Sequence, residues 1–417
     1  MGYSVGIVGG GAAGMAAAVT AAGQGAMVTI LEGNDRLGRK ILSTGNGKCN
    51  LGNENLGPEN YYTESPAVLD ACLKRFDTRS TVAFFREMGL TVKSRNGYLY
   101  PLSEQAASVL DVLRYEVRRL GVEVIPECRV RHVDSGKSWI RVSWDGAYRD
   151  FDRVIVACGG RAAPKSGSDG SGYRIAESLG HRLVPVVPGL VQLRCGEDYF
   201  KSVAGVRAEA MVTLWNRGKQ IAGERGELLL TDYGISGIPV FQLSRRANYI
   251  LRDRGIPEVR VDFFPDCSAE KFEELIRERK KLGKGRTVEE FFAGMLHKKL
   301  MLLFLRLAGL RASEDAQTAD SEKLDRVYRL CRQWQVSVTG SNSYEHAQVC
   351  AGGVSLEEVT QDLESKKVPG IYFAGEILDV DGKCGGYNLQ WAWCSGHIAG
   401  MAASGDVSRF AGAGKDR

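Results

Sequence analysis

The first 32 residues have the pattern of a β-strand, a helix and a second β-strand joined by a glycine-rich turn. The turn reads Gly9, Gly10, Gly11, Ala12, Ala13 and Gly14. Gly9 permits a tight turn, Gly11 lets backbone N–H groups approach a pyrophosphate, and Gly14 allows the helix to pack closely on the strand. The helix N-terminus would then face the phosphates. This segment therefore predicts a dinucleotide-binding unit.

An acid completes this unit. Glu32 ends the second predicted strand, 18 residues after Gly14, where its carboxylate can accept two hydrogen bonds from the ribose of an adenosine. A ribose 2′-phosphate would be repelled there. The alternative is a glycine-rich turn in some other α/β protein, and the strand, the helix and the acid at this spacing favour the dinucleotide-binding unit.

Composition limits the number of domains and the kinds of partner that we expect for this chain. The chain has 417 residues, of which 44% are hydrophobic, so it can bury a large core divided among two or three domains. A net charge of +5 argues neither for nor against nucleic acid or an anionic membrane as a partner. Residues 1–31 are uncharged, but glycines interrupt them and a basic leader is absent. We therefore expect a soluble, cytoplasmic protein.

The ten cysteines form neither a C-x-x-C pair nor a zinc-binding spacing, so no metal site is predicted. We expect most of them to be small reduced hydrophobes. A flavin disulfide reductase needs two thiols a few residues apart, and the loop around Cys49 offers one. Cys49 is thus a residue that can line a cofactor but has no partner thiol.

Residues 34–50 form a loop rich in glycine, hydroxyls and amides, with four cations. Arg39 and Lys40 can neutralise phosphate, and Gly45 and Gly47 let the backbone lie against a flat ring or a ribityl chain. A solvated loop is the alternative. Its position directly after the dinucleotide-binding unit favours the cofactor.

Helices are predicted at 65–76, at 78–88 and from Ser103 to Leu120, and a hairpin turn is predicted at Asn96-Gly97. Period-two stretches up to Cys158 predict the rest of a parallel sheet and a small antiparallel meander.

Between about residues 190 and 275 short alternating strands predict an inserted β domain, and from Ser268 to about Trp334 the pattern is helical. The basic run at 277–286 has two interpretations, a solvated helix end or a nucleic-acid patch. We favour the helix end because no aromatic residues interleave with the cations.

The C-terminal segment from residue 371, called the tail below, repeats the pattern of strand, glycines and helix found in the opening segment. A buried strand at 371–374 leads to Gly375 and Glu376, and the glycine pair Gly385-Gly386 opens a helix of small residues. FAD is longer than NAD and is commonly held from both ends of a chain. The N–H groups after Gly386 would face the flavin ring and stabilise negative charge on the reduced form. An ordinary strand-to-helix crossover is the alternative.

With these motifs the chain resembles the HI0933-like flavoproteins over nearly its whole length. The motifs that carry the resemblance are those of residues 9–14, 38–50, 231–237, 351–354, 373–376 and 385–390. The resemblance implies an α/β fold in which a Rossmann-like FAD-binding domain, of the type found in flavoproteins with two dinucleotide-binding domains, carries an inserted β-barrel-like domain and a helical domain. The implied boundaries are 1–190 plus 346–417 for the FAD-binding domain, 191–267 plus about 335–345 for the β domain, and 268–334 for the helical domain.

The chain departs from the family pattern at Asp232, where histidine is usual, and at Cys384, where threonine is usual. Both departures lie where a substrate could bind. The candidate residues for non-covalent FAD binding are Gly9, Gly11, Ala12, Ala13, Gly14, Glu32, Gly38, Arg39, Lys40, Ser43, Gly45, Asn46, Cys49, Asn50, Val130, Ala157, Gly159, Gly375, Glu376, Asp379, Gly385, Gly386, Asn388, Leu389 and Gln390.

Activities ascribed to the family differ. One branch is similar to enzymes that reduce conjugated double bonds of 3-oxo bile-acid intermediates, and another has been described as amine oxidases acting on aminoacetone. The aromatic run at 98–101, with Tyr387, Trp391 and Trp393, suits a flat apolar ligand better than a small amine, although core packing is the favoured role of the two tryptophans.

We therefore expect an FAD-dependent reductase of an apolar enone, with NAD(P)H as a transient electron donor because a second GxGxxG motif is absent. Tyr387 is the candidate proton donor, and Asp232 and Tyr233 are expected to converge with it. The alternatives are an amine oxidase that releases hydrogen peroxide and a flavin-bound RNA-associated protein. Neither nucleic acid nor membrane is an expected partner, and the oligomeric state stays open.

Overall fold

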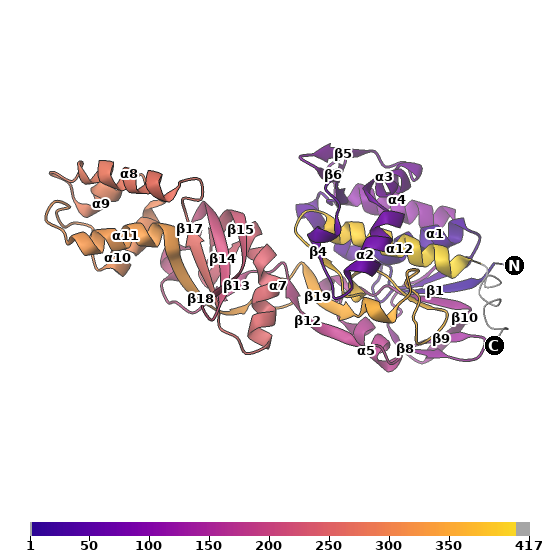
Figure 1. The fold of residues 1–417 in the computed structure, drawn as a ribbon. Helices are drawn as coiled ribbons and strands as arrows, with labels where there is room; N and C mark the ends of the chain where they lie inside the picture. Colours follow the sequence, from indigo (N-terminus) through magenta and orange to yellow (C-terminus); the bar gives the residue numbers. More distant parts are fainter. Residues whose placement is uncertain (1, 406–417) are drawn as a thin grey trace. The chain divides into compact units, whose positions relative to one another are not determined.

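A computed structural model describes residues 2–405, and the predicted end of the FAD-binding domain at 406–417 lies outside them. The chain divides into two compact units (Figure 1). Unit 1 runs to Val187 and resumes at Gln348, and unit 2 comprises Pro188–Ala347. Unit 2 contains both the strands and the helices that the sequence predicts for the insertion.

A five-stranded parallel sheet is the centre of unit 1, with the order β20-β11-β1-β2-β7. Its strands are β1 (Ser4–Val8), β2 (Met27–Leu31), β7 (Glu123–Ile125), β11 (Arg153–Val156) and β20 (Ile371–Phe373). Continuous apolar runs form these strands because helices and loops cover both faces of a parallel sheet. The tail supplies the edge strand, with Ile371 paired to Val154. This confirms the Rossmann-like α/β class.

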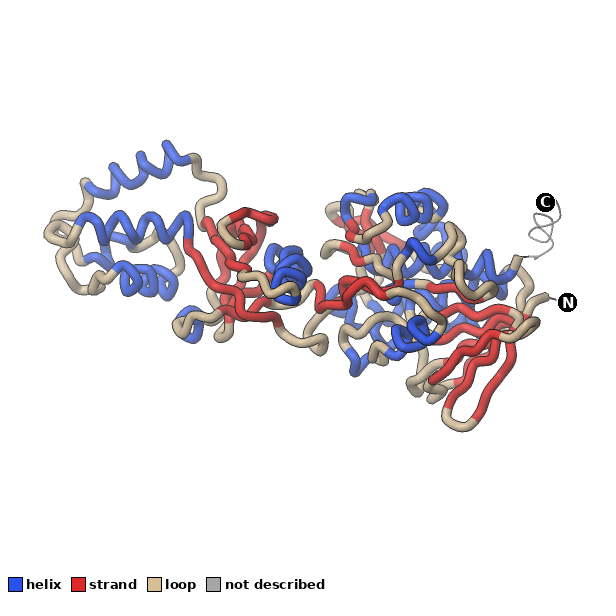
Figure 2. Tube along the Cα trace, turned by 60° about the horizontal axis from the view of Figure 1, so that its bottom comes forward, coloured by secondary structure: helices blue, strands red, loops and turns tan. Residues whose placement is uncertain are grey.

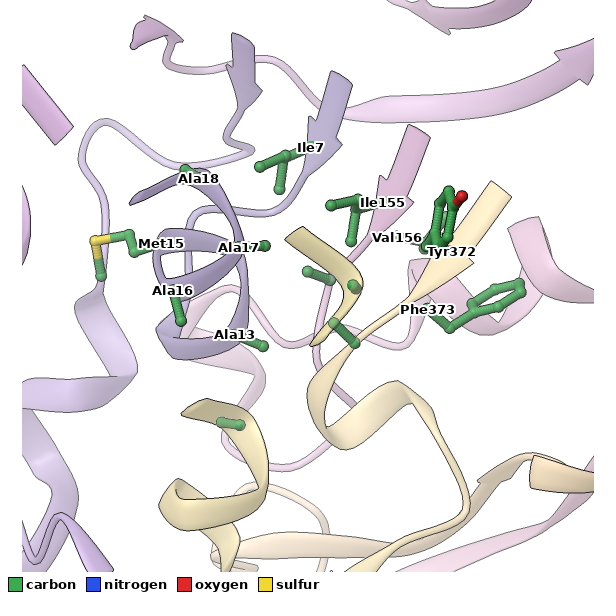
Figure 3. Packing of buried hydrophobic residues seen from close by; sticks show 14 of the residues in the cluster. Ile7, Ala13, Met15, Ala16, Ala17, Ala18, Ile155, Val156, Tyr372 and Phe373 are labelled. Atoms are coloured by element: carbon green, nitrogen blue, oxygen red, sulfur yellow. The ribbon is translucent and has the colours of Figure 1, made fainter. Parts of the chain in front are cut away.

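Two helices from opposite ends of unit 1 pack against each other. They are α1 (Ala12–Gly23) and α12 (Tyr387–Ser404). A Cβ atom on Gly396 would lie 2.3 Å from the carbonyl oxygen of Ala13, so only glycine permits this approach. The alanines of α1 and the side chains of Ile7 and Ile155 fill the space between this helix and the sheet (Figure 3).

Smaller elements surround this core (Figure 2). The helices are α2 (Pro66–Arg75), α3 (Thr78–Glu87), α4 (Ala106–Arg119) and α5 (Ser171–Ser178). The antiparallel strands are β8 (Val130–Ser135), β9 (Ile140–Trp144) and β10 (Ala147–Phe151) of the meander, β3 (Gly52–Asn53), β5 (Val92–Arg95) and β6 (Tyr98–Pro101) of the hairpin sheet, and the pair β4 (Tyr61–Tyr62) with β21 (Asp381–Gly382). A further two-stranded sheet pairs β12 (Leu183–Gly189) with β19 (Val349–Val354).

The hairpin turn at Asn96-Gly97 is confirmed by the pairing of β5 with β6. The predicted start of the third helix at Ser103 is wrong. The helix α4 begins at Ala106 after Gln105, and the Ser103 hydroxyl instead donates a hydrogen bond to the Ser108 hydroxyl.

Unit 2 contains a closed six-stranded barrel and a group of helices. The barrel strands are β13 (Leu193–Cys195), β14 (Arg207–Asn216), β15 (Lys219–Leu230), β16 (Gly234–Gly237), β17 (Pro257–Asp262) and β18 (Trp334–Ser341). The helices are α6 (Phe200–Val203), α7 (Ile238–Arg252), α8 (Ala269–Lys280), α9 (Val288–Phe292), α10 (Lys298–Ala308) and α11 (Ser321–Gln333). Ser268 caps α8 by accepting a hydrogen bond from the Lys271 N–H, as the sequence predicts. Among residues 2–405, no helix is long and apolar enough to cross a membrane.

Candidate cofactor and active site

A groove in unit 1 lies at the carboxyl ends of the parallel strands, where α/β proteins bind their ligands. It encloses about 1320 Å³, including the space open to solvent. Its lining runs from the glycine turn after β1 to the start of α12 in the tail, and this extent suits an elongated cofactor. Fifteen of the predicted residues line it: Gly9, Gly11, Ala12, Ala13, Glu32, Gly38, Arg39, Lys40, Val130, Ala157, Gly159, Gly375, Glu376, Asn388 and Leu389.

The glycine turn leaves room for a phosphate at one position. Gly9 has a φ of +101°, which explains the need for glycine in the turn. A Cβ on Gly14 would lie 1.9 Å from the Gly9 carbonyl oxygen, so this glycine serves packing. A Cβ on Gly11 would meet no protein atom within 4 Å, and Gly11 lines the groove. The open cradle at Gly11 and the start of α1 fit the pyrophosphate of FAD.

Glu32 is buried beside this cradle. Its Oε2 accepts a hydrogen bond of 2.7 Å from the Gly10 N–H, and its Oε1 accepts bonds from the backbone and side chain of Asn34. These bonds fix the carboxylate in the groove wall, and its remaining lone pairs can accept the ribose hydroxyls. Arg39 donates to the Asn34 side-chain oxygen and so joins the same network.

The loop after Glu32 lines the groove as far as Thr44 and then turns through backbone conformations that few residues adopt. Gly45 and Asn46 have φ values of +55° and +53°, and Cys49 has a φ of +57°. With its amide turned so that both the oxygen and the nitrogen have hydrogen-bond partners, the buried Asn50 binds the start of α12, because its oxygen then accepts a hydrogen bond of 3.2 Å from the Gly386 N–H. Burial raises the pKa of the Cys49 thiol to about 12, so this thiol is protonated and unreactive at neutral pH.

The tail forms the opposite wall of the groove. Gly375 donates its N–H to the Ser395 hydroxyl, and Glu376 forms an ion pair of 2.7 Å with Lys40. The side chain of Trp391 lines the groove while its indole N–H donates to the Gly375 carbonyl. Trp393 is fully buried and donates to the Leu51 carbonyl, which is the packing role predicted for it.

Ten predicted residues do not line the groove: Gly14, Ser43, Gly45, Asn46, Cys49, Asn50, Asp379, Gly385, Gly386 and Gln390. Two of them have clear structural contacts. Asp379 accepts a hydrogen bond from the Glu64 N–H, and the fully buried Gln390 accepts one from the Thr81 hydroxyl. These contacts hold the tail against the segment from β4 to α3.

Tyr387 is the first residue of α12, and it is buried outside the groove lining. Its hydroxyl donates a hydrogen bond of 3.2 Å to the Asn55 carbonyl, and its ring makes an edge contact with Tyr61. Burial raises its pKa above the ordinary value. In unit 2, the Tyr233 hydroxyl accepts a hydrogen bond from the Asn342 amide. Its convergence with Asp232 and Tyr387 stays a prediction.

The groove also contains residues that the sequence analysis did not select. They include Asn34, Cys128, Arg129, Ser166, Gly167, Ser168, Asp169, Ser171, Gln348 and Val349. The segment 166–171 is rich in glycine and serine and follows β11, so a glycine-rich loop after a parallel strand was the available signal. Contacts of Cys128 and Gln348 depend on tertiary packing and leave no local pattern.

The chain matches one family model and relatives with two different named activities. The model of the HI0933-like protein Rossmann domain family matches residues 3–402. The 3-dehydro-bile acid delta(4,6)-reductase of Clostridium scindens is 43% identical over 403 residues, covering 96% of this chain and 98% of that protein. The ribosomal RNA dihydrouridine synthase of Haemophilus influenzae is 29% identical over 406 residues, covering 95% of this chain and 98% of that protein.

Among solved structures, a mutant of quinol fumarate reductase FrdA from Escherichia coli matches with a TM-score of 0.50. Its sequence is 16% identical, and the match covers 100% of this chain and 71% of that chain. At this identity the likeness concerns the fold alone.

Proposed function

Because the chain belongs to the HI0933-like family, we propose that it is an FAD-dependent reductase of a C=C bond conjugated with a carbonyl group, and that its substrate is an apolar enone of the 3-oxo steroid type. The groove carries this proposal. It combines an open phosphate cradle at Gly11, a buried acid at Glu32 and a second wall from the tail. The relative at 43% identity, named as a bile-acid reductase, supports the substrate class.

Different residues of the groove would bind different parts of the cofactor. The cradle at Gly11 would hold the pyrophosphate, Glu32 would accept the adenosine ribose, and the walls at Gly375 and Leu389 would enclose the ribityl and ring end. FAD would supply two-electron chemistry there, taking up hydride from a donor and releasing it to the β-carbon of the enone. The hydrogen bonds that the Gly10 and Asn34 N–H groups donate to Glu32 keep the ribose acceptor oriented before the cofactor arrives.

NAD(P)H is the proposed electron donor. It would bind only transiently, because the sequence contains one GxGxxG motif and that motif is assigned to FAD. Tyr387 is the proposed proton donor to the α-carbon. Its hydroxyl donates a hydrogen bond to the Asn55 carbonyl. Donation of the proton to a substrate therefore requires that this hydrogen bond be broken. The cytoplasmic location stays a prediction.

A second candidate is reduction of a uridine in ribosomal RNA. A relative at 29% identity over 95% of the chain is named as a ribosomal RNA dihydrouridine synthase. Uracil also contains a C=C bond conjugated with a carbonyl, so both candidates use the same chemistry. The basic run that ends α8 is the segment that would contact RNA phosphates.

A single experiment separates these functions. The flavin is reduced anaerobically with NADPH or NADH and then mixed with a 3-oxo-4-ene steroid, an rRNA fragment or aminoacetone. We expect the steroid enone to reoxidise the flavin rapidly. Reoxidation by the rRNA fragment alone would favour the second candidate, and peroxide release from oxidised enzyme with the amine would favour an oxidase.

A further inference from the structure

The loop of residues 159–170, which follows β11, crosses the cofactor groove. Its residues Ser166, Gly167, Ser168 and Asp169 line the groove. In the sheet, β1 lies between β11 and β2. The loop nevertheless contacts Asn34, which follows β2: the Asn34 amide donates a hydrogen bond of 3.5 Å to the Ser166 carbonyl, and a Cβ on Gly167 would lie 2.3 Å from the amide nitrogen. The 159–170 loop therefore passes the carboxyl end of β1, where the glycine turn begins.

The loop is compact because its two ends are joined. The Gly170 N–H donates a hydrogen bond of 3.1 Å to the Gly160 carbonyl. A Cβ on Gly159 would lie 2.8 Å from the Ser168 hydroxyl oxygen, so the loop also packs on its own base. Gly167 has a φ of +108°, which favours glycine at the point where the chain turns back. Compact loops with close ends are frequently functional.

An ion pair fastens the loop to the far side of the groove, which is formed by residues that follow β2 and β7. Arg129 pairs with Asp169, and both residues line the groove. Arg129 is held in place because the N–H of the preceding Cys128 donates a hydrogen bond of 2.8 Å to the Glu32 carbonyl. The other carboxylate oxygen of Asp169 accepts a hydrogen bond of 2.9 Å from the Ser171 N–H at the start of α5. The pair thus connects two segments that the chain itself anchors.

This ion pair is strong enough to form and weak enough to open. Solvent reaches 46% of the Arg129 side chain and 28% of the Asp169 side chain. Burial opposes the charge of Asp169, but hydrogen bonds from Ser171 and the charge of Arg129 hold its pKa below the ordinary value, so it is ionised at neutral pH. A partly exposed ion pair contributes little net stability. The loop can therefore open while the rest of the unit stays folded.

The contacts of the loop lie at the adenosine end of the groove. Asn34, which binds Ser166, also donates two hydrogen bonds to Glu32, the acid assigned to the adenosine ribose. The cradle at Gly11 follows β1, which the loop passes. A dinucleotide bound along this path would lie between the sheet and the loop.

We propose that the 159–170 loop is a strap over the adenosine half of FAD, fastened by the Arg129–Asp169 ion pair, and that FAD enters and leaves when this pair opens. The proposal concerns the cofactor and holds for any substrate. Arg129 and Asp169 are positioning residues, because they act through the loop. Since their ion pair joins two parts of the protein, it governs the rates of FAD uptake and release more than the affinity for FAD.

The test measures both rates in Arg129→Ala. Flavin fluorescence in a stopped-flow instrument follows FAD release when the holoprotein is diluted and FAD uptake when the full-length apoprotein is mixed with FAD. We expect both rates to rise about two- to fivefold, the range that corresponds to loss of an exposed ion pair. The dissociation constant, their ratio, should stay within about twofold of the parent value.

A second variant tests the same ion pair from its other side. Asp169→Asn removes the charge but keeps an oxygen for the Ser171 N–H. It should accelerate uptake and release as Arg129→Ala does. The double variant should be no faster than either single variant, because both substitutions remove one interaction.

Arg131→Ala is the matched control. Arg131 lies on β8 and pairs with Asp145 at 3.6 Å, away from the groove lining. This variant should take up and release FAD at the parent rates, and thermal unfolding checks that each variant is folded. Faster release with unchanged uptake in Arg129→Ala would make the arginine a direct contact of FAD. That result, unchanged rates in both single variants, or additive effects in the double variant would overturn the strap.

Discussion

Lys40 Nζ lies 2.7 Å from Glu376 Oε2, which joins two residues 336 positions apart across the cofactor groove. The other oxygen of Glu376 accepts a hydrogen bond from the Cys350 N–H. Three distant segments therefore meet at one carboxylate. Since Glu376 follows the edge strand β20, this wall of the groove forms only after the tail has added its strand to the sheet.

The glycines of the turn allow a matched pair of substitutions. In Gly11→Ala, the new methyl group meets no protein atom within 4 Å, so the apoprotein should fold with nearly unchanged stability. The methyl group would occupy phosphate space, and we expect FAD affinity to fall at least about tenfold, or about 1.4 kcal/mol. Titration of the apoprotein with FAD measures this.

Gly14→Ala is the contrasting variant, because its methyl group would lie 1.9 Å from a backbone oxygen. It should lower the melting temperature even without FAD. Equal FAD affinity in Gly11→Ala and the parent protein would argue against a pyrophosphate at this cradle.

Glu32→Ala should weaken FAD binding by about 1–3 kcal/mol, the usual loss for a charged hydrogen-bond partner. The same change frees the N–H groups of Gly10 and Asn34, so a small loss of stability is expected as well. Glu87→Ala removes an exposed acid from α3 and should leave FAD affinity unchanged. An unaltered dissociation constant for Glu32→Ala would refute the ribose assignment.

Tyr387→Phe tests the proposed proton donor. If the hydroxyl protonates the substrate, flavin reduction by NAD(P)H should be nearly unaffected while reoxidation by the enone slows roughly 10²-fold or more. Stopped-flow absorbance resolves the two half-reactions. Equal reoxidation rates in the variant and the parent would leave the hydroxyl with its structural bond to Asn55 as its one role.

The partly buried His397 should make the fold sensitive to acid. Burial lowers the pKa of His397, which hydrogen-bonds Thr20 and contacts the Phe76 ring in a tilted arrangement. Since the unfolded chain then binds the proton more readily, the stability from this group is complete above pH 6.5 and is lost as the pH falls through the lowered folded value. The melting temperature should decline below pH 6.5, and less steeply in His397→Gln.

His132 is exposed, so His132→Gln provides the matched control. It should retain the acid dependence of the parent protein. Parallel curves of melting temperature against pH for the parent and His397→Gln would show that protonation of His397 does not govern this dependence.

Local patterns explain which parts of the fold the sequence predicts. The glycine turn and Glu32 are recognisable because their geometry depends on neighbours within one βαβ unit. The helix α7 (Ile238–Arg252) was not predicted within the inserted β domain, although its buried Val240, Leu243 and Ala247 follow helical spacing. Short strands on both sides obscured that period.

The candidate site was predictable to a similar degree. Residues on the turn and at the strand ends line the groove, whereas the wall at 166–171 depends on how a loop folds back. Gln390 shows the limit of a motif. It lies two residues after Asn388, which lines the groove, and the turn of α12 directs its side chain to Thr81 of α3 instead.

Reoxidation of the reduced flavin by a steroid enone tests the central claim most directly. The protein is reduced anaerobically with NAD(P)H until the flavin absorbance is bleached, and a 3-oxo-4-ene steroid acid is then added. We predict that the absorbance returns with one saturated product formed per flavin. A flavin that stays reduced with every enone, but is reoxidised by oxygen with peroxide release, would contradict the reductase function.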